Sequence, residues 1–94
     1  MHMIIISVYD KATQAYMRPH VAQTVGQAIR MFEDEAQRQD SEIARHPEDY
    51  ALFQLANFND QTGEIEKIEP LCLRRAHEIS RPVDQNQNQL IGIN

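Results

Sequence analysis

Four aromatic side chains fall in segments that the sequence predicts to be β-strands: Tyr9, Tyr16, Phe53 and Phe58. Four basic side chains occur in or after the last of those segments: Lys67, Arg74, Arg75 and Arg81. A sheet that presents aromatic rings can stack unpaired nucleic-acid bases, while arginine and lysine neutralise the phosphates. Aromatic residues on strands more often belong to the core, and arginines at this place also suit a helix end or solvent. Core packing is therefore the favoured interpretation of the rings, and nucleic-acid binding stays open.

Two other groups of residues could do chemistry. His46, Glu48 and Asp49 offer an imidazole and two carboxylates, which suit metal binding or proton transfer. A turn that begins with proline also attracts charged residues and exposes them to water, and no second ligand cluster occurs in the sequence. Cys72 and His77 lie five residues apart, so on a helix they would not share a face. We expect no metal site, no cofactor, no catalytic residue and no enzyme activity.

The formal net charge of −5 is spread unevenly along the 94 residues. Residues 1–66 carry five basic and eleven acidic side chains, a balance of −6. Residues 67–81 carry four basic and two acidic side chains, a balance of +2, and residues 82–94 add only Asp84. Most of the domain would repel a phosphate backbone, and only the late segment would attract it. We expect no strong, non-specific coating of nucleic acid.

Length and composition predict one small α+β domain at residues 1–79 and a flexible polar tail at residues 80–94. Hydrophobic residues make up 41% of the chain and charged residues 24%, as in ordinary globular proteins. No window approaches about 18 consecutive apolar residues, so we expect no membrane span. The single cysteine excludes an internal disulfide and fits a reducing cytoplasm.

The start of the chain predicts two strands. Residues 3–9 are almost continuously apolar and rich in Ile and Val, which favours a strand buried on both faces. Ile4, Ile6 and Val8 then point to one face, and Met3, Ile5, Ser7 and Tyr9 to the other. Residues 15–18 predict a short second strand at the sheet edge, which ends at Pro19 because proline cannot donate to a ladder.

A helix is predicted over residues 24–38. Thr24 and Gln27 match a reciprocal capping box, in which the side chain of each residue accepts a hydrogen bond from the backbone N–H of the other. Apolar residues then recur at helical spacing: Val25, Ala28, Ile29, Phe32 and Ala36. Residues 39–45 are either one further helical turn opened by Asp40 or a loop.

The second half of the chain predicts a hairpin. Residues 50–58 alternate with apolar side chains on both faces, which indicates a central strand. Residues 59–63 suit a turn that ends in a left-handed glycine, and residues 64–69 suit a charged edge strand that ends at Pro70. Residues 71–79 predict a short helix. The final segment, LIGIN at 90–94, is apolar enough to dock, although a frayed end is favoured.

These elements assemble into ββαββ: a four-stranded antiparallel sheet, in the order 2-1-3-4, with one helix on one face and a C-terminal appendage. One helix cannot cover both faces of such a sheet. Four residues are expected on the uncovered side and predict a partner interface there: Ile5, Tyr9, Phe53 and Leu55. The simplest partner is a second copy of the chain, in a two-fold homodimer.

Several of these segments together resemble a known family. They are SVYD at 7–10 with the following Lys-Ala, Ala15-Tyr16, Pro19, TVGQAIRMF at 24–32, HPEDYALFQL at 46–55 and the bend at Thr62-Gly63. In this order and spacing they resemble the small non-structural protein of gokushovirus-type microviruses, which are single-stranded DNA phages. The resemblance covers about residues 4–68. One departure is Ala56-Asn57, where members of that family often carry Gly-Glu before the phenylalanine.

The resemblance implies a phage accessory factor in the host cytoplasm that acts in genome replication or in the packaging of single strands. Proteins of this kind are presumed to bind DNA. The residues expected to bind it are Lys67, Arg74, Arg75 and Arg81 on phosphates, and Tyr9, Tyr16 and Phe53 on bases. The alternative is a protein-interaction module without DNA contact, whose open sheet face binds a viral or host replication protein.

Overall fold

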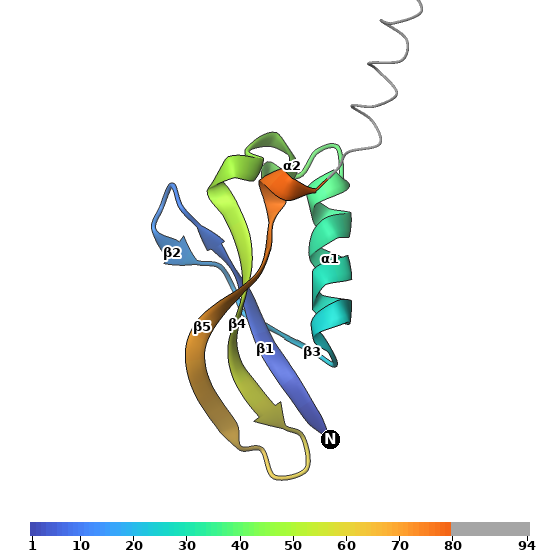
Figure 1. Cartoon of the computed structure of the whole chain (residues 1–94), viewed down its shortest axis with the longest axis vertical. Coiled ribbons are helices and arrows are strands. Elements are labelled where there is room, and N and C mark those ends of the chain that lie inside the picture. Colours follow the sequence, from blue (N-terminus) through green and yellow to red (C-terminus); the bar gives the residue numbers. More distant parts are fainter. Residues whose placement is uncertain (80–94) are drawn as a thin grey trace, which may run out of the picture.

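The computed structural model describes residues 1–79 and shows an antiparallel sheet with one main helix against one of its faces (Figure 1). The strands are β1 (His2–Asp10), β2 (Ala15–Tyr16), β3 (His20–Ala22), β4 (Tyr50–Asn59) and β5 (Ile65–Arg75). The helices are α1 (Val25–Gln37) and the short α2 (Glu42–Arg45), with 3-10 turns η1 (Pro47–Asp49) and η2 (Ala76–Glu78). The predicted α+β class is confirmed, and the predicted tail at 80–94 lies outside the described residues.

The sheet has the order β2-β1-β4-β5, so the predicted arrangement of the four main strands is correct. The sequence prediction missed β3, which also pairs with β1 and makes the sheet five-stranded. Pro19 does end the pairing of β2, but the chain continues along β1 and bonds to it again at His20–Ala22. The reason is Ala22, whose small side chain is buried opposite Ile4 and holds this segment against the core.

The end of the domain differs most from its prediction. The edge strand does not stop at Pro70, and no helix forms over residues 71–79 except the single turn η2. Gln54 pairs with Leu71 and Ala56 pairs with Lys67, so three residues of β5, Pro70 among them, bulge opposite one residue of β4. A bulge on an edge strand is a place where proline costs no ladder hydrogen bond, and the strand therefore resumes beyond it.

Helix α1 begins at the predicted cap. The Thr24 hydroxyl accepts a hydrogen bond from the backbone N–H of Gln27 at 3.0 Å. The Gln27 side chain accepts a hydrogen bond from the backbone N–H of Gln23 at 2.7 Å. In a reciprocal capping box it would instead bond the backbone N–H of Thr24, the cap residue itself. Of the two alternatives for residues 39–45, the structure shows a helical turn, but only over Glu42–Arg45, and Ser41 caps it in place of Asp40. The Ser41 hydroxyl accepts from two backbone N–H groups of α2, which satisfies donors that would otherwise be buried unpaired.

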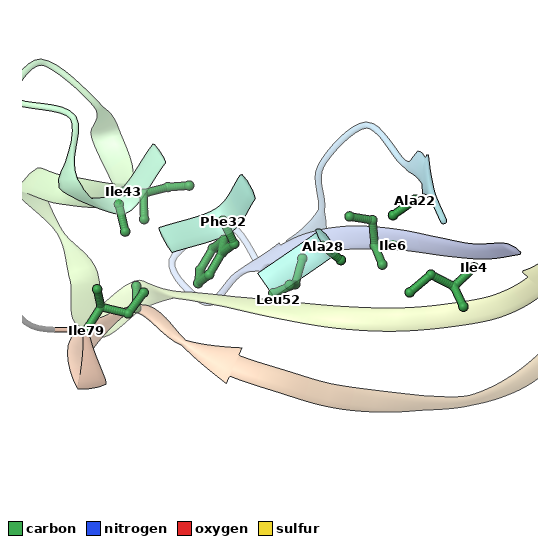
Figure 2. Close-up of a cluster of buried hydrophobic side chains, with 10 residues drawn as sticks. Ile4, Ile6, Ala22, Ala28, Phe32, Ile43, Leu52 and Ile79 are labelled. Atoms are coloured by element: carbon green, nitrogen blue, oxygen red, sulfur yellow. The ribbon is translucent and has the colours of Figure 1, made fainter. Parts of the chain in front are cut away.

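The core lies between α1 and one face of the sheet (Figure 2). Ile4 and Ile6 of β1 and Leu52 of β4 point toward Ala28 and Phe32 of α1. The other residues of the cluster come from β3, the end of α1, α2 and the segment after β5: Ala22, Ala36, Ile43, Ala76 and Ile79. Burial of a side chain such as Leu52, which is 2% exposed, stabilises the fold by about 1.5–3 kcal/mol. Within residues 1–79, no helix covers the opposite face of the sheet.

The β4–β5 hairpin closes as predicted. Asn59 accepts hydrogen bonds through its side chain from the backbone N–H groups of Gln61 and Thr62, and Gly63 has φ +79°. Only glycine adopts this left-handed conformation without strain, so the residue fixes the bend.

Candidate nucleic-acid interface

The strand register defines which residues share the face opposite α1, here called the uncovered face. Directly paired residues of neighbouring strands project to the same side. Four rows of paired residues make up this face: Tyr16–Tyr9–Ala51–Arg75, then Ser7–Phe53–Cys72, then Val21–Ile5–Ala56–Lys67, and last Met3–Phe58–Ile65. Their neighbours along each strand, such as Ile6 and Leu52, belong to the core on the other side.

Three aromatic rings meet at one end of the uncovered face. The ring centroids of Tyr9 and Tyr16 are 4.9 Å apart, those of Tyr16 and Phe53 are 5.7 Å apart, and those of Tyr9 and Phe53 are 6.2 Å apart. All three pairs are edge-to-face, the arrangement that the ring quadrupole favours. The structure thus brings together the three residues that the sequence singled out for stacking. Tyr16 is 41% exposed and is the most accessible of them.

Local hydrogen bonds hold this aromatic cluster in place. In the turn between β1 and β2, the Asp10 side chain accepts from the backbone N–H of Ala12 at 2.9 Å, and Gln14 takes a left-handed conformation with φ 57°. On the far side of Tyr16, the Ser7 hydroxyl donates to the carbonyl oxygen of Met17 at 2.6 Å. These contacts hold the backbone on both sides of Tyr16 against β1, which places its ring next to those of Tyr9 and Phe53.

The predicted basic residues separate onto two sides of the sheet. Arg75 is paired with Ala51 on the uncovered face, in the same row as Tyr9 and Tyr16. Arg74 is paired with Leu52 on the face that α1 covers, where its guanidinium lies 3.2 Å from a carboxylate oxygen of Glu33. Arg74 thus has an acidic partner in α1, and Arg75 is the neighbour that faces away from the helix.

Lys67 also belongs to the uncovered face, where it is paired with Ala56 and exposed. Arg81 lies outside the described residues. Among the paired positions of the uncovered face, two residues are basic, Lys67 and Arg75, and none is Asp or Glu. The acidic side chains of residues 1–79 lie in turns, on helices or on other positions of the strands. Although the whole chain is acidic, the paired positions of this face are aromatic, apolar or cationic.

The expected partner interface is only partly brought together. Ile5 lies two rows from the aromatic cluster, while Tyr9 and Phe53 belong to the cluster itself. Leu55 is half-buried and falls in the bulge of β4, where neither neighbouring strand provides a paired residue. The register adds two exposed residues that the sequence prediction did not include, Val21 at 49% and Ile65 at 61% exposed. Val21 was missed with β3, whereas Ile65 follows from the hairpin, since it pairs with Phe58.

The residues considered for metal or proton chemistry do come close together. Ligand atoms of His46, Glu48 and Asp49 all lie within 4.8 Å of one another, on η1 and the residue before it. The side chains of His46 and Glu48 are exposed, as expected for a solvated turn. Next to them, partial burial and then nearby carboxylates raise the pKa of Tyr50. This end of the sheet is therefore acidic, and it also holds the aromatic cluster, because the pair Tyr9–Ala51 directly adjoins the pair Asp10–Tyr50.

Cys72 and His77 belong to different elements. Cys72 is half-buried on β5 and pairs with Phe53, while His77 is exposed on η2. The thiol therefore lies beside the aromatic cluster. Within residues 1–79, no helix is long and apolar enough to cross a membrane.

Comparison with known protein families identifies what the chain is similar to. The model of the phage ORF5 protein family matches residues 3–79 of the 94 residues. The chain belongs to the phage ORF5 protein family. The match extends through β5 and η2, so the strand that carries Lys67 and Arg75 is part of the family domain. No curated protein and no solved structure matches this phage protein.

Proposed function

We propose that this phage ORF5 protein is a non-structural accessory factor that binds single-stranded DNA on the uncovered face of its sheet. It acts in the host cytoplasm during genome replication or packaging, by itself with low affinity or inside a replication complex. Its resemblance to the gokushovirus-type protein supports this setting. The observation that carries the proposal is the meeting of three aromatic rings with Arg75 and Lys67 on a face whose paired positions hold no acid.

The aromatic cluster favours a single strand over a duplex. Unpaired bases present a free π-face that can stack on a ring, whereas the faces of paired bases are hidden within the duplex. Each stacked base contributes about 1–3 kcal/mol. Tyr16 is the most exposed ring of the cluster and therefore offers the largest stacking surface.

The two cations define the path of the strand. Arg75 and Lys67 lie on β5, eight residues apart, which corresponds to at most about 26 Å of extended strand. A DNA single strand that runs along β5 would pass both cations, and its bases would then face β4 and β1. With two phosphates neutralised, the log–log salt slope is about −1.4, so affinity falls about sevenfold between 50 and 200 mM salt.

The test is a titration of a fluorescent oligothymidine with the full chain at those two salt concentrations. Cys72, the single cysteine of the chain, provides a second readout, because it lies beside Phe53 on the binding face. Bound oligonucleotide should slow the alkylation of its thiol. Binding that does not depend on salt would refute the electrostatic part, and an unchanged alkylation rate at saturation would refute the location.

A second candidate function is a homodimeric interaction module that does not touch DNA. The observation in its favour is the apolar end of the uncovered face, where Val21 and Ile65 are 49% and 61% exposed. An apolar patch of this kind favours a protein partner, either a second copy or a viral or host replication protein. Sizing the protein in solution with and without the oligonucleotide separates the candidates. A stable dimer that does not bind the oligonucleotide supports the second.

A further inference from the structure

A groove opens on the other side of the sheet, beside α1. Its volume is about 330 Å³, and it lies between α1 and the segment that joins β2 to β3. Its lining includes the core side chains of Ile6, Phe32 and Leu52. Met17 and Met31 also line the groove, one from each side, and are 50% and 48% exposed. The groove therefore connects the hydrophobic core with the surface.

The chemistry of the groove calls for an apolar occupant. Protein interiors are close-packed, and a hollow that reaches core side chains forfeits dispersion contacts that an apolar group would restore. Methionine is flexible and polarisable, so two methionines can close around an occupant of irregular shape. A volume of about 330 Å³ has room for a few aliphatic side chains.

We propose that the chain's own segment Leu90–Ile93 occupies this groove. The described chain ends at Ile79, which is buried in the same core cluster as Phe32 and Ile43, two residues that line the groove. The sequence that follows is mainly polar, with Val83 as an exception, until the apolar run LIGI at 90–93. The occupant thus matches the mainly apolar lining of the groove, and the described chain ends in the core cluster that shares Phe32 and Ile43 with that lining.

The connecting segment is long enough. From Ile79 to Leu90 is 11 residues, which span up to about 36 Å when extended. This length exceeds the diameter of about 10–12 Å of helix α1, which borders the groove. A short tether gives an effective concentration in the millimolar range, so weak contacts suffice for docking within one chain. This inference does not depend on DNA binding.

Selective ¹³C labelling of the methionine methyl groups tests this placement in the full chain. Of the four methionines, Met17 and Met31 line the groove. Met1 and Met3 lie at the other end of the molecule, where the Met1 amino group is 2.9 Å from Asp60. A nitroxide is attached at Gln87→Cys in a Cys72→Ser background. It should broaden the signals of Met17 and Met31 and spare the other two. Equal broadening of all four signals, or of none, overturns the proposal.

Two controls complete the test. The triple variant L90S/I91S/I93S, with the same label, should restore the Met17 and Met31 signals because the apolar contact is removed. If they stay broadened, apolar docking is not what holds the tail, and the proposal is wrong. In a mixture of nitroxide-bearing chains and ¹³C-methionine chains without nitroxide, no broadening is expected. Selective broadening in the mixture would mean that a second copy supplies the segment and would overturn docking within one chain.

Discussion

Arg74 and Arg75 are adjacent in sequence and project to opposite faces of the sheet, so they allow a sharp test of where DNA binds. The comparison uses three single substitutions, Arg75→Ala, Arg74→Ala and Arg30→Ala. Arg30 is exposed on α1, away from the uncovered face, and its loss changes the net charge equally. Any effect of overall charge is thus common to all three variants.

The expected magnitude follows from counterion release. Each phosphate contact on a single strand contributes about 0.7 to the log–log salt slope. Between 1 M and 0.1 M salt, one phosphate contact therefore raises the binding constant by about 0.7 log units, which is about fivefold. Arg75→Ala should therefore weaken binding about fivefold at 0.1 M salt and reduce the slope from about 1.4 to about 0.7.

The two control arginines should behave differently. Arg30→Ala should leave the slope unchanged. Arg74→Ala should also leave the slope unchanged, but it should lower the free energy of unfolding by less than about 1 kcal/mol, since the Arg74–Glu33 pair is partly exposed. Oligonucleotide titrations at several salt concentrations measure the slope, and urea denaturation measures stability. Equal loss of slope in all three variants would refute the assignment of binding to one face.

Three further predictions concern single side chains. Tyr16→Ala should remove a stacking surface worth about 1–3 kcal/mol in oligonucleotide titrations, whereas truncation of Val25, 39% exposed on α1, should not change affinity. Leu52→Ala should lower the free energy of unfolding by about 2–5 kcal/mol in urea, while the same change at Leu71, which is 53% exposed, should cost far less. The folded state raises the pKa of Tyr50, mainly through burial, so it binds the phenolic proton more tightly than the unfolded chain does. Stability should therefore fall as pH rises above about 10, and Tyr50→Phe should flatten this slope in alkaline denaturation curves.

The sequence could predict the elements whose signals are local. Thr24 marks the start of α1 because a hydroxyl cap depends only on the next three residues. Gly63 fixes the β4–β5 bend because its φ is left-handed. The central positions of β1 and β4 follow from apolar residues on both faces, which an edge strand would expose to water.

The elements that were mispredicted depend on partners distant in sequence. Pro70 reads as the end of a strand, yet a bulge against β4 accommodates it, and no local pattern records how many residues that bulge takes up. The short strand His20–Ala22 exists because Ala22 fits against Ile4, a contact across 18 residues of chain. Without the β4–β5 register, the placement of Arg74 and Arg75 on opposite faces of the sheet could not be deduced.

The candidate site also depends on pairings between residues that are distant in sequence. Tyr9, Tyr16 and Phe53 were chosen as residue types on strands, and their meeting at one place depends on two pairings of β1, one with β2 and one with β4. Composition suggested that the basic residues form one late cluster. The register instead places Arg75 and Lys67 on the uncovered face and leaves Arg74 beside an acid of α1.

An acidic protein can bind a polyanion when its charges are segregated by face. At physiological salt the screening length is about 8 Å, which is less than the roughly 10 Å between packed layers. Carboxylates on α1, such as Glu33 and Glu35, lie beyond the sheet from Arg75 and are largely screened from a strand on the uncovered face. At low salt this screening fails, and the net charge of −5 acts against binding. The log–log plot should therefore bend near about 10 mM salt, where the screening length of about 30 Å is well above the roughly 10 Å between packed layers, and a plot that stays straight there would refute segregation by face.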